Sequence, residues 1–285
     1  TEDASYPSAD DNHGHGSNVA GIIADTANDF AGRGIASGVK IMPLKTMKGD
    51  GTGKTDWTLK ALAYATEARE KYNEDPSQEG AYNVKVVNFS LGSYKRLTAF
   101  ETIISKAIEQ GIVICAAAGN YDNSASYYPA GYEGVICVGS VNSMLEKSYF
   151  SNYGSGVDVC APGGESRRTY NYDKSELNIA SGQFELTESV YASGNVSADR
   201  VSARRGTSQA TPMVSAAAAL IMTRYPNLTP AEVESRIKST ATCTKENNLG
   251  AGCINVPAAL GIVSVPDEPA YSIPSNTDIG IGADI

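Results

Sequence analysis

Two kinds of apolar pattern alternate along the first half of the chain. Apolar side chains recur at helical spacing in three segments: 19–27, 55–72 and 98–110. Strand-like apolar runs lie between or after them: 38–47, 84–92 and 112–120. Nearly continuous apolar runs that alternate with helices are typical of parallel strands buried on both faces. The pattern therefore predicts an α/β fold in which helices cover both faces of a mostly parallel central sheet.

The second half of the chain is less regular. Strand-like runs at 135–142 and 157–163 precede a long polar stretch from Gly163 to Arg205, and an alanine-rich helix is expected at 212–225. The segment 265–285 is rich in proline and acidic residues, which favours an extension or linker. We expect one domain over 1–264 followed by that extension.

Charge and composition exclude some classes of function. The 285 residues have a formal net charge of −9, and an acidic surface does not suit nucleic acid as a partner. No apolar run is long enough for a membrane span. The acidic balance suits a secreted or cell-surface protein.

The five cysteines are scattered. Cys115, Cys137 and Cys160 lie in apolar runs and are expected to be buried thiols. Cys243 and Cys253 flank a polar loop, where a disulfide or two free thiols are both open readings. No C-x-x-C spacing suggests zinc.

The stretch "GTSQATPMVSAAAALIM" contains the clearest candidate for chemistry. Ser208 stands at the start of the expected helix, and Pro212 is placed in its first turn, where a missing N–H costs little. A serine there lies at the positive end of the helix dipole, which would stabilise an oxyanion. The alternative is that Ser208 is only a helix cap.

Two further stretches have a chemical and a structural reading. In "HGSNVAGIIA" His15 begins a helix and could act as a base, although a histidine near a terminus is often a surface residue. In "AAAGN" Asn120 ends a strand of small residues, and its amide could donate to an oxyanion or simply form a turn. A metal site on His13 and His15 is disfavoured because two histidines are too few for zinc.

Taken together, these stretches resemble the subtilisin-like serine proteases. "HGSNVAG" is similar to the family block H-G-T-H-V-A-G, "GTSQATP" to G-T-S-x-A-x-P, and "AAAGN" to the segment of the oxyanion-hole asparagine. The stretches "VVNFSLGS", "YYPAGYEGVICVGSV" and "LGAGCINVPAAL" are also similar to family segments. The resemblance covers residues 13–262 and implies the three-layer α/β/α fold of that family and serine endopeptidase activity, with zymogen processing.

The resemblance also implies residue roles. Ser208 would be the nucleophile, His15 the general base and Asn120 a donor to the oxyanion, whereas His13 does not match the motif. Tyr127 stands where the family often has a smaller residue at the base of the specificity pocket, which would shorten the pocket or change its polarity. The expected edges and walls of the substrate groove are Gly51, Thr52, Gly53, Ser90, Leu91, Gly92, Ala117, Ala118 and Gly119.

A structural calcium ion is a further implication, and no organic cofactor is expected. The family's calcium loop corresponds in length to the segment after His15. Its oxygen ligands here would be the carbonyls of Thr26, Phe30 and Gly32 and the side chain of Asn28.

The chain departs from the family in three respects. Ser17 and Asn18 replace threonine and histidine of the motif, and the stretch from Gly163 to Arg205 is longer than in compact members. The family's aspartate lies on a strand well before the histidine. The residues before His15 contain no such strand, and Asp10 and Asp11 lie too close to be its partners.

Two hypotheses follow from the missing aspartate. We expect an N-terminal fragment, separated by processing or belonging to another chain, to supply the aspartate and its strand, and a propeptide would be a second partner. The alternative is a chain that lacks the residue, which would make it a pseudoprotease or a peptide-binding scaffold.

Overall fold

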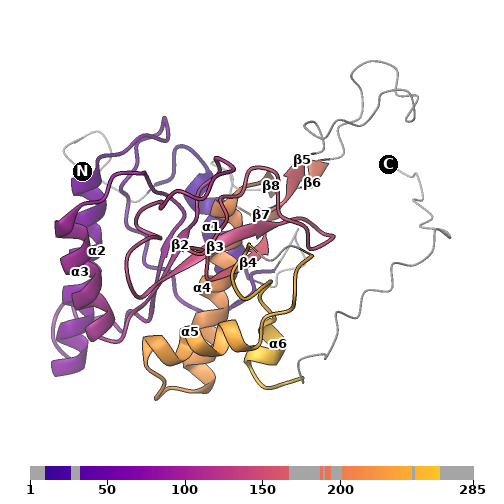
Figure 1. The fold of residues 1–285 in the computed structure, drawn as a ribbon. Coiled ribbons are helices and arrows are strands. Elements are labelled where there is room, and N and C mark those ends of the chain that lie inside the picture. Colours follow the sequence, from indigo (N-terminus) through magenta and orange to yellow (C-terminus); the bar gives the residue numbers. More distant parts are fainter. Residues whose placement is uncertain are drawn as a thin grey trace, which may run out of the picture.

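A four-stranded parallel sheet forms the centre of the molecule (Figure 1). The computed structural model describes residues 10–26, 33–166, 187–188, 190–193, 201–245 and 248–263. The sheet order follows the chain, and neighbouring strands are parallel. The strands are β1 (Val86–Phe89), β2 (Val113–Ala117), β3 (Val135–Val141) and β4 (Val159–Pro162).

Helices cover both faces of this sheet, as the sequence predicted. Helices α2 (Thr55–Glu74) and α3 (Thr98–Glu109) pack on one face, and α4 (Thr207–Arg224), α5 (Pro230–Ser239) and the short α6 (Val256–Ala259) on the other. Figure 1 shows α2 and α3 side by side, away from α4 and α5. The fold is therefore the expected three-layer α/β/α arrangement.

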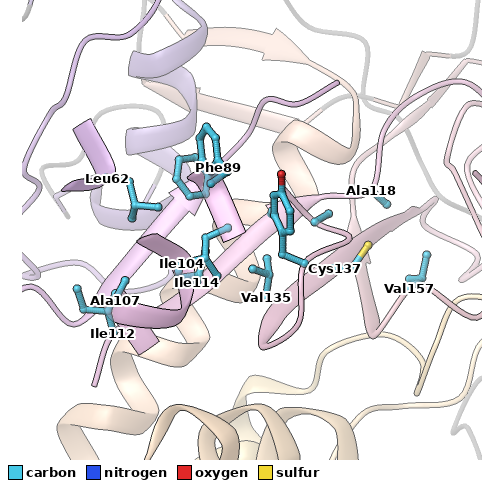
Figure 2. Packing of buried hydrophobic residues seen from close by; sticks show 14 residues of the cluster. Leu62, Phe89, Ile104, Ala107, Ile112, Ile114, Ala118, Val135, Cys137 and Val157 are labelled. Atoms are coloured by element: carbon cyan, nitrogen blue, oxygen red, sulfur yellow. The ribbon is translucent and has the colours of Figure 1, made fainter. Parts of the chain in front are cut away.

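A hydrophobic core lies on each face of the sheet, and side chains from a single strand pack into both cores. In β2, Ile114 packs toward α2 and α3, whereas its neighbours Val113 and Cys115 pack toward α4. In β3, Val135 and Ile136 divide in the same way. Figure 2 shows the core on the side of α2 and α3, which includes Leu62, Ile104 and Ile114. This period of two explains why the strands read as continuously apolar.

Helix α1 (His15–Ala24) lies beside α4, and the strand β7 (Val190–Ser193) lies beside α1. Strand β7 pairs with β8 (Val201–Arg204), and β5 (Glu165–Ser166) pairs with β6 (Thr187–Glu188), both antiparallel. These pairs belong to the long polar stretch of the sequence.

Two predictions on local structure are wrong. No strand forms at 38–47, where residues 39–46 are irregular and the side chains of Ile41 and Leu44 are exposed. The placement of Pro212 is also wrong, because α4 begins at Thr207 and the proline lies in its second turn and not its first. The segment 265–285 lies outside the described residues, so the extension stays a prediction.

The cysteines of the apolar runs are buried thiols, as predicted. Cys243 is exposed and Cys253 is buried, and neither forms a disulfide. Thr242, not Cys243, is the antiparallel bridge partner of Cys253. Because successive side chains of an extended segment point to opposite sides, Cys243 faces away from Cys253.

None of the helices among the described residues is long and apolar enough to cross a bilayer.

Candidate active site

Ser208 occupies the first turn of α4. Gly206 precedes this helix with φ 147°, a conformation that favours glycine, and a Cβ atom there would lie 3.3 Å from Asn120 Nδ2. The backbone N–H of Ser208 has no acceptor among the described residues, as expected for the first turn of a helix. The Ser208 hydroxyl is half-buried and donates to the carbonyl oxygen of Ser90 over 3.2 Å.

Pro212 explains how the turn that contains Ser208 is anchored. A proline has no N–H, so the carbonyl four residues earlier, that of Ser208, lacks its helical donor. The Ser90 hydroxyl replaces it and donates to Ser208 O over 2.7 Å. Asn88 Nδ2 donates to that hydroxyl over 3.0 Å, and Asn88 Oδ1 accepts from Ser215 Oγ. The nucleophile candidate is thus tied to the end of β1.

Asn120 is oriented by the neighbour of Ser208. Its Oδ1 accepts from both the backbone N–H and the hydroxyl of Thr207, each over 2.9 Å. Because the oxygen is held by α4, the amide nitrogen is left near Gly206, and no described residue accepts from it. Two donors, Asn120 Nδ2 and Ser208 N–H, are therefore available to an anion. The role of Thr207 was missed in the sequence, although Thr207 belongs to the same motif.

His15 is placed at the start of α1 by a tight turn. Gly14 has φ 82°, the left-handed conformation that glycine tolerates. The Asp11 carboxylate accepts from the backbone N–H groups of His13, Gly14 and Ser17 over 2.7–2.9 Å. Burial would raise the pKa of Asp11, but these bonds lower it to about 2. Asp11 therefore caps the helix, and no hydrogen bond joins it to His15 among the described residues.

The surroundings of His15 favour a neutral imidazole. Burial lowers the pKa of His15, and the nearby charges of Arg204 and His13 lower it further, whereas Asp11 acts in the opposite direction. Arg204 Nη2 donates to His13 O over 3.0 Å, and its buried Nε has no partner within the described part of the chain. A neutral imidazole can accept a proton at neutral pH.

A buried hydrogen bond links the two helices of the site. Gln209, next to Ser208, donates from Nε2 to Asn18 Oδ1 over 3.1 Å. Asn18 stands where the family motif has a second histidine, so this departure has a structural role here. Within the described ranges no hydrogen bond joins Ser208 to His15, since the serine hydroxyl is turned to Ser90.

The predicted groove residues fall into two groups. Ser90 adjoins Ser208 directly, and Gly119 N donates to Thr207 Oγ1 over 3.3 Å, so the segments 90–92 and 117–119 flank the start of α4. The segment 51–53 lies in a turn closed by an antiparallel bridge from Met47 to Gly53.

The turn at 51–53 adjoins His13 and the start of α2. A Cβ on Gly51 would lie 3.1 Å from His13 Nε2. The buried Trp57 has the ammonium groups of Lys48 and Lys54 at 5.9 and 5.2 Å from its ring centroid. The turn therefore lies against His13, whose ring centroid is 6.3 Å from that of His15.

The expected calcium ligands are mostly outside the described residues. Asn28, Phe30 and Gly32 lie in the range that is not described, and Thr26 is exposed just after α1. In the described ranges no three His, Cys, Asp or Glu side chains gather as metal ligands. The calcium site stays a prediction.

A hydroxyl at a helix start, a neutral imidazole on the neighbouring helix and two amide donors are the groups that a serine hydrolase uses. The family model described as "Subtilase family" matches residues 1–255. The chain belongs to this family.

Similarity to individual members supports this family assignment. The chain is 35% identical over 254 residues to Subtilisin of Bacillus pumilus, covering 87% of this chain and 78% of the relative. It is 35% identical to Subtilisin E of Bacillus subtilis (strain 168), of which it covers 56%. Several relatives of high similarity are thus matched over only about half of their length.

The fold has solved counterparts. A structure of proteases from Pseudoalteromonas arctica superposes with a TM-score of 0.71 at 30% identity, covering 87% of this chain and 70% of that chain. A structure titled as a cold adapted subtilisin-like serine proteinase has a TM-score of 0.66 at 26% identity, covering 85% and 74%.

Proposed function

We propose that this chain forms most of the catalytic centre of a serine endopeptidase. The observation that carries the proposal is the pair of amide donors, Asn120 Nδ2 and Ser208 N–H, held beside one serine hydroxyl. Such preorganised donors stabilise the charge that develops on a carbonyl oxygen during acyl transfer. We propose a peptide or protein as the substrate, bound in extended form along the substrate groove.

The proposed reaction uses these groups in turn. Ser208 Oγ leaves Ser90 O by rotation about its Cα–Cβ bond and attacks the peptide carbonyl carbon, while His15 takes the hydroxyl proton. The oxyanion accepts from the two amide donors. When the C–N bond breaks, the amine leaves with the proton from His15, and water then hydrolyses the acyl-enzyme by the same steps.

We propose further that the carboxylate partner of His15 comes from a preceding segment or from another chain, and that this segment adds beside β1. Both Asp11 oxygens are occupied by backbone N–H groups. Among the described strands β1 is an edge, and its residues Val86 and Val87 are only half-buried, whereas β2 and β3 are fully buried. Since parallel strands end at the same edge, a strand paired with β1 would end near Ser90, beside the site.

The alternative is a pseudoprotease or peptide-binding scaffold. The specific observation in its favour is that no carboxylate is hydrogen-bonded to His15 among the described residues. Without such a partner the imidazole is not fixed in its tautomer or orientation, and turnover falls steeply.

Covalent labelling separates these functions. The purified protein, assembled with the segment that supplies the aspartate, is incubated with a fluorophosphonate-biotin probe and, separately, with casein. Endopeptidase function predicts labelling and casein cleavage that disappear in Ser208→Ala and persist in Ser239→Ala, an exposed serine of α5. A peptide-binding scaffold predicts no labelling but retained binding of a fluorescein-labelled casein peptide.

The origin of the carboxylate has its own test. Intact mass under denaturing conditions should detect, in active material, a further segment that contains an Asp-x-Gly strand. Full activity of material consisting of residues 1–285 alone would contradict this part of the proposal. Secretion and a structural calcium ion are also proposed, and activity in the culture medium and its loss with a chelator would support them.

A further inference from the structure

The two flanking segments, 90–92 and 117–119, border a space beside the start of α4. This inference rests on the proposed function. Segments 90–92 and 117–119 lie on either side of the start of α4, through the contacts of Ser90 and Gly119 with Ser208 and Thr207. The side chain on the amino side of the scissile bond (P1) projects from the carbonyl that Ser208 attacks. The family resemblance implies that 90–92 form one edge of the groove and that 117–119 line the pocket for this side chain, so we expect it to enter the space between the two segments.

The ring of Tyr127 occupies this space. A Cβ atom on Gly92 would overlap Tyr127 Cε1 and lie 2.8 Å from its Cδ1. A Cβ on Gly119, in the opposite segment, would lie 3.2 Å from Tyr127 Cγ. The ring thus touches the backbone of both walls at the two residues that have no side chain. Its hydroxyl also donates to Gly92 O over 2.7 Å, which fixes the ring across the gap.

Two exposed tyrosines hold the ring in place. The ring centroids of Tyr94 and Tyr121 lie 5.1 and 5.9 Å from that of Tyr127, and 5.4 Å from each other. Asn123 Nδ2 donates to the Tyr94 hydroxyl over 2.8 Å. Aromatic pairs at these separations are favourable, so movement of Tyr127 out of the gap would break two ring contacts and one hydrogen bond.

The hydroxyl of Tyr127 keeps its proton over the whole range in which a histidine base works. Burial raises the pKa of Tyr127 to about 12, and the neighbouring Tyr121 and Tyr94 act in the same direction. The bond to Gly92 O is therefore a permanent part of the site at neutral and mildly alkaline pH.

We propose that Tyr127 fills the P1 pocket and restricts the enzyme to substrates with a small P1 residue, namely glycine, alanine or serine. Leucine or phenylalanine at P1 would have to displace the ring. Tyr94 and Tyr121 are positioning residues for the ring, and Gly92 and Gly119 provide the room it takes.

A pair of peptide substrates tests the proposal. The protein is assayed with succinyl-Ala-Ala-Pro-Ala-p-nitroanilide and succinyl-Ala-Ala-Pro-Phe-p-nitroanilide, and kcat/KM is measured for each. We expect the alanine substrate to be preferred by about 10- to 100-fold, the range that corresponds to overpacking a filled site. Tyr127→Gly should reverse the preference, mainly by lowering KM for the phenylalanine substrate.

Control variants separate the ring from its hydroxyl. Tyr127→Phe keeps the ring and should keep the preference for alanine, and Tyr121→Ala should weaken it only partly. Tyr82→Ala, an exposed tyrosine outside the cluster, should change nothing. If Tyr127→Gly does not fold, the proposal is still tested by the ratio of kcat/KM for the two substrates in Tyr127→Ala and in the unmodified protein.

The outcomes distinguish this proposal from the function on which it rests. Equal or better cleavage of the phenylalanine substrate by the unmodified protein, or an unchanged preference in Tyr127→Gly, overturns the proposal and leaves the endopeptidase function standing. In protein assembled with the aspartate-bearing segment, absence of both cleavage and fluorophosphonate labelling in every variant overturns the endopeptidase function, and the P1 restriction with it.

Discussion

Replacing Ser90 by alanine should destabilise the protein through the carbonyl of Ser208. The Ser90 hydroxyl donates to that carbonyl over 2.7 Å and accepts from Asn88 Nδ2 over 3.0 Å. Pro212 removes the helical donor that would otherwise serve the same carbonyl. Ser90→Ala leaves both the acceptor and the amide without these partners. Because both bonds are half-buried, we expect a cost of about 1–2 kcal/mol, in the lower part of the range for buried unsatisfied groups.

A second substitution tests the explanation and not only the size of the effect. In Pro212→Ala the backbone N–H returns and can donate to Ser208 O. The cost of Ser90→Ala should therefore be smaller by about 1 kcal/mol in that background. The control is Ser105→Ala on the exposed face of α3, whose hydroxyl donates to Glu101 O while the helix keeps its own backbone bonds. It should cost less than about 0.5 kcal/mol.

Urea titrations followed by far-ultraviolet circular dichroism give the free energies of unfolding. All variants carry His15→Ala so that self-cleavage does not interfere. The reasoning is refuted if the cost of Ser90→Ala is the same in both backgrounds within about 0.5 kcal/mol, the usual limit of additivity.

Three further predictions concern other groups of the site and surface. Thr207→Val keeps the backbone bond to Asn120 but loses the hydroxyl's bonds to Asn120 and Gly119, and should lower kcat up to about 10-fold. Thr223→Val, on the same helix, loses only an exposed bond from its hydroxyl to Ala219 O and should leave kcat unchanged. Asp11→Ala should lower the free energy of unfolding at pH 7 by about 1 kcal/mol. The pKa of this carboxyl falls from 3.8 to about 2 on folding, so its contribution is present above pH 4 and lost toward pH 2, and the difference between the two proteins in urea titrations should vanish at the acidic end. Iodoacetamide should modify the native protein at Cys243 alone, because the other four thiols are buried; mass spectrometry showing a second modified site would contradict the fold around them.

The sequence predicted the layers because each buried strand carries its own signal. Val113, Ile114 and Cys115 are all apolar since consecutive side chains enter different cores. The prediction of a strand at 38–47 is wrong because a strand also needs an adjacent strand for its backbone hydrogen bonds. Apolar residues such as Ile41 give no information on whether that neighbour is present, and here the side chain is exposed.

For the site, the sequence indicated the groups but not how they are held. Ser208 and Asn120 stand out as a helix-start serine and a strand-end amide. The hydrogen bond from Thr207 to Asn120 spans 87 positions, and that from Gln209 to Asn18 spans 191. Such bonds depend on how α1, β2 and α4 pack, and no local pattern encodes them. The same holds for Pro212, whose effect on Ser208 becomes visible only once Ser90 lies opposite.

The position of Trp57 gives this protein an optical reporter of its own. It is the chain's single tryptophan, and the ammonium groups of Lys48 and Lys54, on either side of the turn at 51–53, lie 5.9 and 5.2 Å from its ring centroid. Indole emission responds to nearby charge, so a peptide that shifts either lysine on entering the groove would change the emission wavelength without any label. Rapid mixing could then time the arrival of a peptide separately from the cleavage of its bond.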